Sequence, residues 1–547
     1  MREAFALHQA GNLPQAETLY RKILGLQPDN HDALYLLGLI ESKRGNAGRA
    51  IALIENAIRH HDRDSAFHLS LGDILYQLER WPEAAGCYEA ALRLAPDRMG
   101  PHLVPALANL ATVYRSQGRI DASLAMFREA LALAPTEADI FSSYLFTLNF
   151  STSLSPGEVF AEHRRYSELF DTHGRRTGNT DPARKIRLGY VSPDFNHHAV
   201  SYFIEPVLAH HDPARFEIFC YYLQANEDAV TARLKALSAQ WIACAALPDE
   251  QLAARIEADR IDLLIDLAGH TANNRLPVFA RKPAPVQATW LGYLNTSGLK
   301  AMDYRLTDGY ADPPGISERY HSETLARLPD SQWCYRHPGP TPPVSRLPAL
   351  AAGAIRFGSF NKFQKLSELL LRIWVDVLLQ LNDATLLIVG VPRGEQARLA
   401  QFFAGRGIVA QRLEMHDRVP LDKFREMHQR VDIALDAHPY SGATTACDSL
   451  WMGVPTLTLT GASSISRSCS SLLQTLGLTE WIASTPEEFV ELAKRNAGDL
   501  QRLAALRAGL RGRMETSPLM DAARFTRNIE SAYRDMWRAH CGAIRVA

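Results

Sequence analysis

The chain has 547 residues, long enough for about three to four domains of ~150 residues each. Its 59 lysines and arginines nearly balance its 60 aspartates and glutamates, a formal net charge of −1 that argues against a nucleic acid or an anionic membrane as partner. The seven cysteines are widely spaced, the first residues lack a sustained apolar core, and no apolar run reaches the ~20 residues of a membrane span. We therefore expect a soluble cytoplasmic protein without a signal peptide or a disulfide framework.

Helical repeats are expected over residues 1–150. The segment Leu71–Pro96 is echoed by Leu110–Pro135, and a Leu-Gly pair at positions 37–38 recurs 34 residues later. This period resembles that of the tetratricopeptide repeat, whose helix pairs stack into a superhelix with a concave surface. A generic helical bundle is the less favoured alternative. The extra residues around 98–105 should lengthen or kink one helix.

Residues 151–184 are expected to join the repeats to the rest of the chain. Helical patterning without the repeat continues to about Leu169 and should pack the array onto the next domain. The segment Thr172–Lys185 is polar and basic but has no interleaved aromatic residues. A solvated linker is therefore favoured over a nucleic-acid surface.

From Lys185 onward, strand-like runs alternate with helical patterns, which is typical of doubly wound parallel sheets. We expect an N-terminal Rossmann-like half over residues 185–345 on the acceptor side and a C-terminal half over residues 346–547 that binds a nucleotide. The proline-rich segment 331–353 is interpreted as the hinge, and a long amphipathic helix should begin near Asp521. Two such halves place a cleft between the carboxyl ends of both sheets.

The stretch 431–461 (VDIALDAHPYSGATTACDSLWMGVPTLTLTG) predicts a strand, a loop of small residues, a helix and a second strand. Gly442 and Ala443 let a phosphate approach the backbone, and Thr444 and Thr445 add hydroxyl donors where the helix opens. The free N–H groups and the positive helix end make this an anion site, with Asp448 one turn further as an acceptor for ribose hydroxyls. An ordinary crossover with a small-residue loop is the alternative.

A lysine lies close to the same site in the predicted topology. The segment Gly358–Lys365 (GSFNKFQK) follows the first strand of the second half and leads into a helix expected from about Lys365 to Gln380. A lysine at the positive end of a helix is unfavourable unless an anion lies between the two. Lys365 is therefore a candidate for binding that anion, and an exposed lysine without a role is the alternative.

Titratable residues also follow strands of the first half. Asp194 and His198 lie in a loop at the carboxyl end of a strand, where a histidine facing the cleft is a candidate general base. From the residues alone, a plain loop role is favoured for them. Asp266 and His270 end another strand on the same rim and either line the acceptor side or form a structural pair.

Other common phosphate and catalytic motifs are missing from the sequence. There is no G-x-G-x-x-G, no G-x-x-x-x-G-K-[ST], no G-x-S-x-G and no H-E-x-x-H. The one D-x-D, Asp62 to Asp64, lies in a turn of the helical repeats, far in sequence from either sheet. A diphosphate held by a metal is therefore not expected, and no cofactor is predicted.

Taken in order, the repeats and the motifs GYVSPDFNHH, KPAPVQATWLGYLNTSG, GSFNKFQK and GATTACDSLWMGVPTLT resemble the O-linked N-acetylglucosamine transferases, glycosyltransferase family 41. The chain is similar to a compact bacterial homologue, because the long insertion of the animal enzymes between the two halves is missing. The resemblance implies a GT-B fold and inverting, metal-independent transfer of N-acetylglucosamine from UDP-GlcNAc to serine or threonine hydroxyls. It also implies protein or peptide acceptors held along the repeat superhelix.

The resemblance assigns roles to single residues. His198 matches the histidine proposed as base or substrate-positioning group, and Lys365 matches the lysine on the UDP diphosphate. Asp448 matches the ribose-binding aspartate, and Val419 lies where the family's backbone reads uracil. The implied UDP-sugar site consists of Asn361, Gln364, Lys365, Val419, Gly442, Ala443, Thr444, Thr445 and Asp448.

The chain departs from the animal enzymes at several positions. Ala443 stands where they have a histidine beside the diphosphate, and Phe424 stands near the uracil in place of another histidine. Their asparagine ladder for peptides survives at Asn109 but is replaced by Leu36 and Ser70 in earlier repeats. Two alternatives stay open: a GT-B transferase with another nucleotide sugar or acceptor, and a repeat scaffold whose catalytic half binds nucleotide without turnover.

Overall fold

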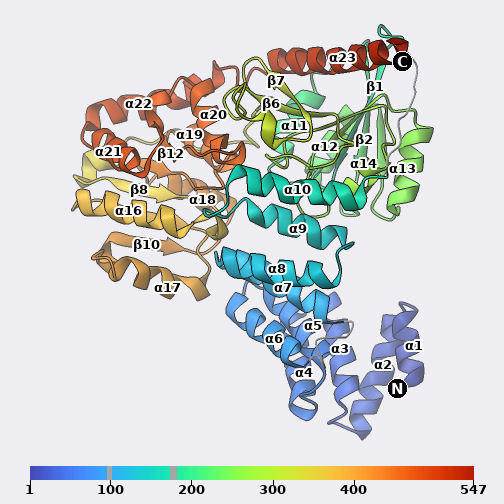
Figure 1. Ribbon diagram of the computed structural model, residues 1–547. Helices are drawn as coiled ribbons and strands as arrows, with labels where there is room; N and C mark the ends of the chain where they lie inside the picture. Colours follow the sequence, from blue (N-terminus) through green and yellow to red (C-terminus); the bar gives the residue numbers. More distant parts are fainter. Residues whose placement is uncertain (95–101, 173–180, 547) are drawn as a thin grey trace. The chain divides into compact units, whose positions relative to one another are not determined.

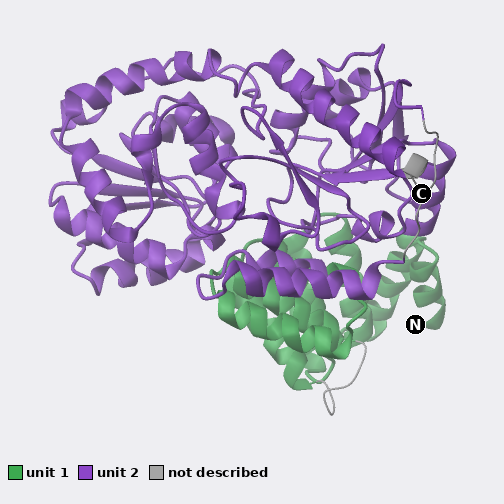
Figure 2. Ribbon diagram, turned by 45° about the horizontal axis from the view of Figure 1, so that its top comes forward, with its two compact units in different colours: residues 1–140 green, residues 141–547 purple. Residues whose placement is uncertain are grey.

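The computed structural model of the protein describes residues 1–94, 102–172 and 181–546. The chain divides into two compact units, residues 1–140 and residues 141–547, which Figure 2 shows in different colours. Among the described residues, the first unit is helical and the second contains two parallel sheets. A helical repeat region followed by two Rossmann-like sheets is the fold class that the sequence predicts, and it is confirmed.

The first unit consists of helix pairs, as the 34-residue period predicts (Figure 1). A Cβ on Gly38 would lie 2.7 Å from Cγ1 of Ile54, and one on Gly72 would lie 2.6 Å from the ring of Tyr88. The repeated glycines therefore mark where the two helices of a pair approach each other most closely. Its helices in the described range are α1 (Arg2–Gln9), α2 (Leu13–Leu26), α3 (His31–Lys43), α4 (Ala47–His60), α5 (Ser65–Gln77), α6 (Trp81–Leu94), α7 (Leu103–Ser116) and α8 (Ile120–Leu133).

Two sequence features of this unit can be placed. The D-x-D lies in the turn between α4 and α5, where the Asp64 side chain caps α5 by accepting from the Ala66 N–H at 2.9 Å. The insertion around residues 98–105 falls partly on residues 95–101, which lie outside the described residues.

Helices α9 (Ala138–Leu148) and α10 (Pro156–Phe170) provide the helical segment expected before the sheets. They pack on a loop of the first sheet: His163 Nε2 lies 2.7 Å from the Tyr293 hydroxyl, and Asn149 Nδ2 donates to that hydroxyl at 2.8 Å. A Cβ on Gly298 would lie 2.1 Å from the His163 carbonyl oxygen, so glycine is required at this contact. Most of the predicted linker 172–185, namely residues 173–180, lies outside the described residues.

The first sheet is parallel and has the order β3-β2-β1-β4-β5-β6-β7. The order reverses between β1 and β4, and the carboxyl end of such a switch point is where α/β proteins bind ligands. Its strands are β1 (Ile186–Ser192), β2 (Phe216–Tyr222), β3 (Gln240–Ala243), β4 (Leu263–Asp266), β5 (Val286–Thr289), β6 (Tyr304–Asp308) and β7 (Thr324–Leu328). Its helices are α11 (Ser201–Leu208), α12 (Ala229–Leu237), α13 (Asp249–Ala258) and α14 (Leu276–Ala280).

The second sheet has the parallel order β10-β9-β8-β11-β12-β13, with its switch point between β8 and β11. The two predicted anion-binding segments follow these two strands. Its strands are β8 (Arg356–Ser359), β9 (Thr385–Val389), β10 (Leu413–His416), β11 (Ile433–Leu435), β12 (Thr456–Leu459) and β13 (Ile482–Ala483). Its helices are α15 (Ala349–Ala352), α16 (Glu368–Gln380), α17 (Arg393–Ala404), α18 (Leu421–His428), α19 (Thr444–Trp451), α20 (Ser468–Thr475), α21 (Pro486–Ala497) and α22 (Leu500–Glu515).

The sequence patterns missed part of both sheets. Strands β3, β7 and β13 were not predicted; helix α12 ends at Leu237, and Gln240 and Trp241 already belong to β3. All three strands lie at or near sheet edges, and β3 and β13 are short. A short edge strand needs no apolar alternation, so these strands leave little trace in the sequence.

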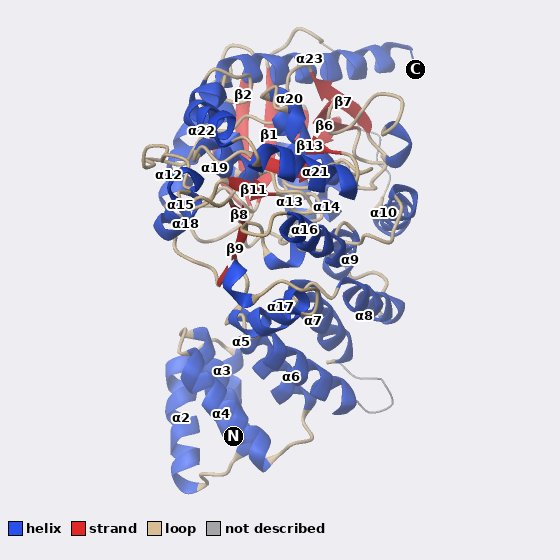
Figure 3. Ribbon diagram, turned by 90° about the vertical axis from the view of Figure 1, so that its left-hand side faces the viewer, coloured by secondary structure: helices blue, strands red, loops and turns tan. Residues whose placement is uncertain are grey.

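The last helix, α23 (Ala522–Val546), returns from the second sheet to the first (Figure 1). Its Tyr533 hydroxyl lies 3.2 Å from that of Tyr190 on β1, and Glu530 lies 2.9 Å from His211. Figure 3 shows the strands of this unit covered by helices. The domains of the two sheets also meet directly. Ser471 of α20 donates to Asp308, the last residue of β6, at 2.6 Å, and Arg305 of β6 donates to Ser464 at 3.1 Å.

Candidate functional site

The loop between β11 and α19 is shaped by a buried carboxylate. Asp436, directly after β11, accepts hydrogen bonds from Ser441 Oγ at 2.6 Å, the Gly442 N–H at 2.8 Å and Thr458 Oγ1 at 2.8 Å. A Cβ on Gly442 would lie 2.3 Å from Thr445 Oγ1, so the loop can close this tightly only around glycine. The small residues predicted for phosphate access therefore also serve to fold the loop.

The amino end of α19 is open, as an anion site requires. The helix begins at Thr444, and the residue before it, Ala443, has no side chain that could cap the first N–H groups. Thr445 Oγ1 donates to Asn361 Oδ1 at 3.0 Å, which joins the loop after β8 to the start of α19. Free N–H groups at the positive end of a helix favour a phosphate.

Lys365 lies beside this helix end, but not as predicted. It is the last residue of a short 3-10 turn (Phe363–Lys365), and α16 starts only at Glu368, capped by Ser367. A serine oxygen can accept a helix N–H and a lysine cannot, so the helix start moves past Lys365. Lys365 Nζ donates instead to the Ser441 carbonyl at 3.2 Å and lies 4.2 Å from the centroid of the Tyr440 ring. Burial lowers its pKa to about 7, opposed by the charge of Asp436.

Gln364 and Val419 are less closely connected to this cluster. Gln364 is half-buried in the same 3-10 turn as Lys365. Val419, also half-buried, packs against an apolar cluster that includes Phe360 and Met427. Both lie on the nucleotide half, as predicted from the resemblance.

Asp448 occupies a small pocket next to the anion site. The Tyr335 hydroxyl donates to its Oδ1 at 2.9 Å, and burial raises the pKa of Asp448 to about 6. The pocket encloses about 20 Å³, and four of its nine lining residues have aromatic rings. Its lining residues are Tyr202, His337, Pro338, Leu421, Phe424, Arg425, His428, Asp448 and Met452.

Asp194 and His198 form a pair on the opposite half, in the loop after β1. His198 Nδ1 lies 3.5 Å from Asp194 Oδ2, and the His198 side chain is 48% exposed. Partial loss of hydration lowers the pKa of His198 to about 4, with further contributions from Lys362 and His197. Burial raises the pKa of Asp194 to about 6, opposed by Lys362. Lys362 follows β8, so its charge acts on this pair from the second half of the fold.

Asp266 and His270 lie at the predicted rim but are fully engaged in the structure. Asp266 is buried and accepts from the Ala268 and Gly269 N–H groups and from Thr289 Oγ1. His270 is buried between Ser142 Oγ at 3.0 Å and the Ser297 carbonyl at 2.8 Å. Each residue is therefore held by groups other than its expected partner, and neither lines either pocket described here.

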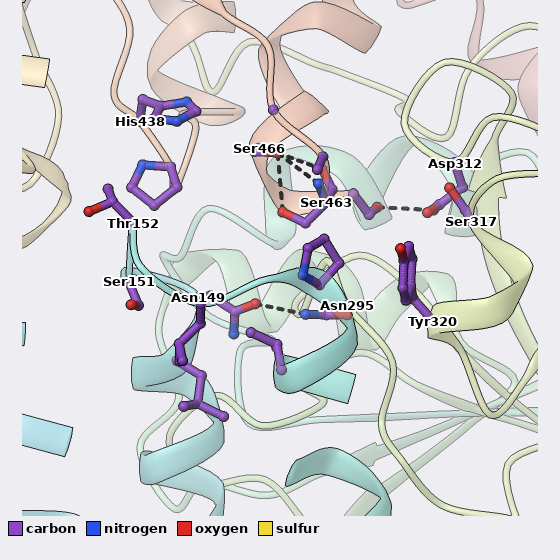
Figure 4. Close-up of a pocket in the computed structure, with 18 of the residues that line it drawn as sticks. Asn149, Ser151, Thr152, Asn295, Asp312, Ser317, Tyr320, His438, Ser463 and Ser466 are labelled. Atoms are coloured by element: carbon purple, nitrogen blue, oxygen red, sulfur yellow. Dashed lines mark hydrogen bonds between the residues drawn. The ribbon is translucent and has the colours of Figure 1, made fainter. Parts of the chain in front are cut away.

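A larger pocket of about 170 Å³ lies between the α9–α10 turn and loops of both sheets (Figure 4). Asn149 and Asn295 are joined across it, and Ser464 donates to Asp312 on its wall at 3.0 Å. It contains none of the predicted site residues. Its lining residues are Leu148, Asn149, Ser151, Thr152, Leu154, Pro156, Val159, Asn295, Asp312, Ser317, Tyr320, His321, Leu369, His438, Pro439, Gly461, Ala462, Ser463, Ser464 and Ser466.

Several residues that shape the site escaped the sequence reasoning. Asp436 ends a buried apolar strand, and a carboxylate at that position is a signal that could have been used. Tyr335 lies in the proline-rich segment, where no pattern marks it. In the described residues, no group of three or more His, Cys, Asp or Glu side chains is arranged to hold a metal ion.

Two Rossmann-like sheets whose domains contact each other, preceded along the chain by helical repeats, correspond to the GT-B fold with tetratricopeptide repeats that the sequence predicts. The family model for glycosyl transferase family 41 matches residues 171–339 and 345–529, and one for tetratricopeptide repeats matches residues 62–136. The chain belongs to glycosyl transferase family 41.

Relatives of the chain are found among plant proteins. It is 38% identical to the probable UDP-N-acetylglucosamine–peptide N-acetylglucosaminyltransferase SPINDLY of Petunia hybrida over 426 residues, 75% of this chain and 45% of that protein. It is 30% identical to the probable UDP-N-acetylglucosamine–peptide N-acetylglucosaminyltransferase SEC of Arabidopsis thaliana over 65% of this chain and 38% of that protein. The chain spans about half the length of the curated relatives it matches.

One solved structure is similar along nearly the whole chain. A mutant of the O-GlcNAc transferase of Thermobaculum terrenum superposes with a TM-score of 0.79 at 32% identity and covers 99% of this chain and 97% of its own. Within the part of the chain that the structure describes, no helix is both long and apolar enough to cross a membrane.

Proposed function

We propose that this protein is an inverting glycosyltransferase that moves N-acetylglucosamine from UDP-GlcNAc to serine or threonine hydroxyls of proteins. One observation supports it above all: the Lys365 ammonium donates to the Ser441 carbonyl, in the loop that leads into α19. This places an ammonium beside free N–H groups, a combination suited to the diphosphate of a nucleotide sugar. The names of the relatives agree with UDP-GlcNAc as the donor and with a peptide as the acceptor.

In the proposed reaction an acceptor hydroxyl oxygen attacks the anomeric carbon. The bond from this carbon to the phosphate oxygen breaks, and UDP leaves with the electron pair. Lys365 and the amino end of α19 stabilise the negative charge that develops on the leaving phosphate, as fixed dipoles that need no rearrangement. A metal ion is not required for this step in the proposal, because the ammonium and the helix end supply the positive charge.

The hydroxyl proton needs an acceptor on the other side of the cleft. At pH 7 the His198 imidazole is neutral and the Asp194 carboxyl is mostly ionised, so either can take a proton. With a pKa near 6, Asp194 matches the working pH more closely. We therefore assign proton transfer to the Asp194–His198 pair, with an oxygen of the donor phosphate as the competing acceptor.

The proposal is tested by following UDP release from UDP-GlcNAc in the presence and absence of candidate acceptor proteins, with excess chelator in parallel reactions. Acceptor-dependent release that survives chelation is expected. Release from another UDP- or GDP-sugar instead would change the donor, and tight UDP binding without release from any sugar would leave a nucleotide-binding scaffold. Rescue by magnesium or manganese after chelation would contradict metal independence.

Acceptor binding and cellular location complete the proposal. The tetratricopeptide array supports protein or peptide acceptors, because stacked helix pairs offer an extended concave surface. A reducing, cytoplasmic location fits the free thiols among the described residues, which include Cys87, Cys220, Cys244, Cys334, Cys447 and Cys469.

A further inference from the structure

A buried arginine in the Asp448 pocket has no place in the mechanism so far. The Arg425 side chain on α18 is only 13% exposed, and its Nε is buried without a hydrogen-bond partner in the described residues. Its nearest carboxylate, Asp422, lies 3.8 Å away and is almost fully exposed. An arginine buried in this way loses hydration without full compensation.

Two other buried arginines of the second unit are paired. Arg305 forms an ion pair with Asp312, and Arg507 donates to the carbonyls of Val431 and Ser345. Arg425 differs from these two in having an unpaired donor, and it differs from Arg467, whose Nη1 also lacks a partner, in lining a pocket. An unused donor of this kind is expected where a ligand supplies the acceptor.

The surroundings of Arg425 indicate what that ligand is. Tyr202, His337, Phe424 and His428 give the pocket aromatic walls, which fit a flat ring. The same pocket holds Asp448, and the positive charge of Arg425 lowers the pKa of both Asp448 and Tyr202 against the effect of burial. Arg425 thus lies on the side of the anion site where the nucleoside of a bound nucleotide would extend.

We infer that Arg425 selects the base of the nucleotide donor by donating a hydrogen bond to the carbonyl oxygen at position 4 of the pyrimidine ring. The inference rests on the proposed function, which gives uracil as the base. At position 4 of the ring, uracil carries a carbonyl oxygen and cytosine carries an amino group. With cytosine bound, the amino group and the Arg425 guanidinium would both be hydrogen-bond donors and neither would find an acceptor. A site built to hydrogen-bond one group rejects an analogue that lacks it, because its own buried donors are left unpaired.

The pocket encloses about 20 Å³, less than a base occupies, so a base must displace side chains as it enters. Tyr202 and His337 come from the first half and from the connecting segment, whereas Arg425 and Asp448 come from the nucleotide half. Separation of the two halves would therefore open the pocket and leave Arg425 on the nucleotide half.

The test compares Arg425→Met with Lys423→Met in the full-length chain. Lys423 lies on the same helix but is exposed and paired with Glu426, so it serves as the matched control. Dissociation constants for UDP, CDP, GDP and ADP are measured by calorimetry. Arg425→Met should weaken UDP binding about 10- to 100-fold and leave CDP binding within about 3-fold of its original value, as expected for losing a hydrogen bond from a charged group. Lys423→Met should change neither.

The outcomes separate this inference from the proposed donor. If Arg425→Met weakens UDP and CDP equally, or neither, Arg425 does not read the base and the inference is wrong. If the unmodified chain prefers GDP and Arg425→Met removes that preference, Arg425 reads a base carbonyl but the proposed UDP donor is wrong. The melting temperature should not fall in Arg425→Met, because no partner loses a hydrogen bond; a large decrease would instead indicate a structural role.

Discussion

At the scale of single residues, the proposed diphosphate site depends on Lys365. It contacts the loop that opens α19, so Lys365→Ala should weaken UDP binding. The leaving phosphate gains charge during the reaction, so turnover should fall further, by about 10²-fold or more. Calorimetry with UDP and single-turnover rates with the sugar donor measure the two effects. Unchanged UDP affinity would place the diphosphate elsewhere.

The pKa of Lys365 gives the same residue a pH signature. With a pKa of about 7, Lys365 is charged below neutral pH and loses its proton above it. A diphosphate favours the ammonium form, so the dissociation constant for UDP should rise from pH 7 to pH 9, by at most about tenfold per pH unit. Lys365→Arg keeps the charge over this range and should flatten the profile. A steep profile in that variant would assign the titration to another group.

The Asp194–His198 pair should affect the rate and spare donor binding. His198→Ala should reduce turnover by about 10²–10⁴ if the pair takes the proton, while UDP affinity stays nearly unchanged. His197→Ala serves as the control, because its neighbouring imidazole is exposed and lies outside the pair. Single-turnover rates decide this. Near-normal turnover in His198→Ala would assign the proton to the donor phosphate.

The sequence predicted the positions of several site residues along the chain better than it predicted the hydrogen bonds that hold them in place. Gly442, Thr444, Thr445 and Asp448 could be placed because a helix start and its preceding loop are local in sequence. Asp436 accepts a hydrogen bond from Ser441, 5 positions along the chain, and Tyr335 donates to Asp448, 113 positions along the chain. Neither contact repeats with the period of a helix or a strand, so neither leaves a pattern in the sequence. Lys365 lies outside α16 because Ser367 caps that helix. The sequence argument considered only the charge of Lys365 and not the preference for serine as the capping residue.

At the scale of elements, an aromatic stack connects α9 to Lys365. The Phe150 ring, just after α9, stacks on Tyr440 at 4.7 Å between centroids, and Lys365 Nζ lies over the Tyr440 ring at 4.2 Å. The ring face attracts the ammonium, so Tyr440 is a positioning residue for Lys365. Tyr440→Leu should weaken UDP binding several-fold and shift its pH dependence to lower pH, since a less stabilised ammonium loses its proton earlier.

Tyr440→Phe keeps the ring face and should behave like the original chain in both measurements. A merely structural role would instead lower the melting temperature of Tyr440→Leu without moving the pH profile of UDP binding. Equal effects of the leucine and phenylalanine variants on that profile would assign the interaction to the Tyr440 hydroxyl and contradict a role for the ring face.

Helix contacts in the first unit offer a second test at this scale. A methyl group at Gly72 on α5 would lie 2.6 Å from the Tyr88 ring on α6, whereas Gly86 on α6 has nothing within 4 Å. Gly72→Ala should destabilise the array by about 1–3 kcal/mol through overpacking. Gly86→Ala should stabilise it by roughly 0.5–1 kcal/mol, because alanine is the better helix former. Thermal unfolding monitored by circular dichroism compares the two, and equal stabilities would show that the helices separate at no cost.

Most elements were predictable because their patterns are local. Glycines that recur after 34 residues located the helix pairs, and apolar runs located central strands such as β1 and β11. Short strands at the sheet edges were missed. The pairing of α23 with the first sheet could not be predicted either, because an amphipathic helix shows that it has a partner without showing which one.

At the scale of the whole molecule, the proposed division of labour assigns acceptors to the repeats and the donor to the sheets. Asn109 on α7 occupies the one surviving position of the asparagine ladder, and its Nδ2 donates to Asp73 Oδ1 at 2.8 Å. This bond orients the amide and leaves its oxygen available for a peptide N–H. In the earlier repeats the corresponding contact is Ser70 with the Tyr35 hydroxyl at 2.9 Å, which offers no amide.

Asn109→Ala should therefore raise KM for a protein acceptor about 3- to 10-fold, the cost of roughly one hydrogen bond, and leave both UDP affinity and the turnover number nearly unchanged. Asn56→Ala on α4, the second helix of its pair, is the matched control and should leave KM unchanged. Steady-state kinetics at saturating donor, with UDP binding measured separately, tests both variants. If Asn109→Ala lowered the turnover number or UDP affinity as much as it raised KM, the repeats would contribute to the chemistry and the division of labour would fail.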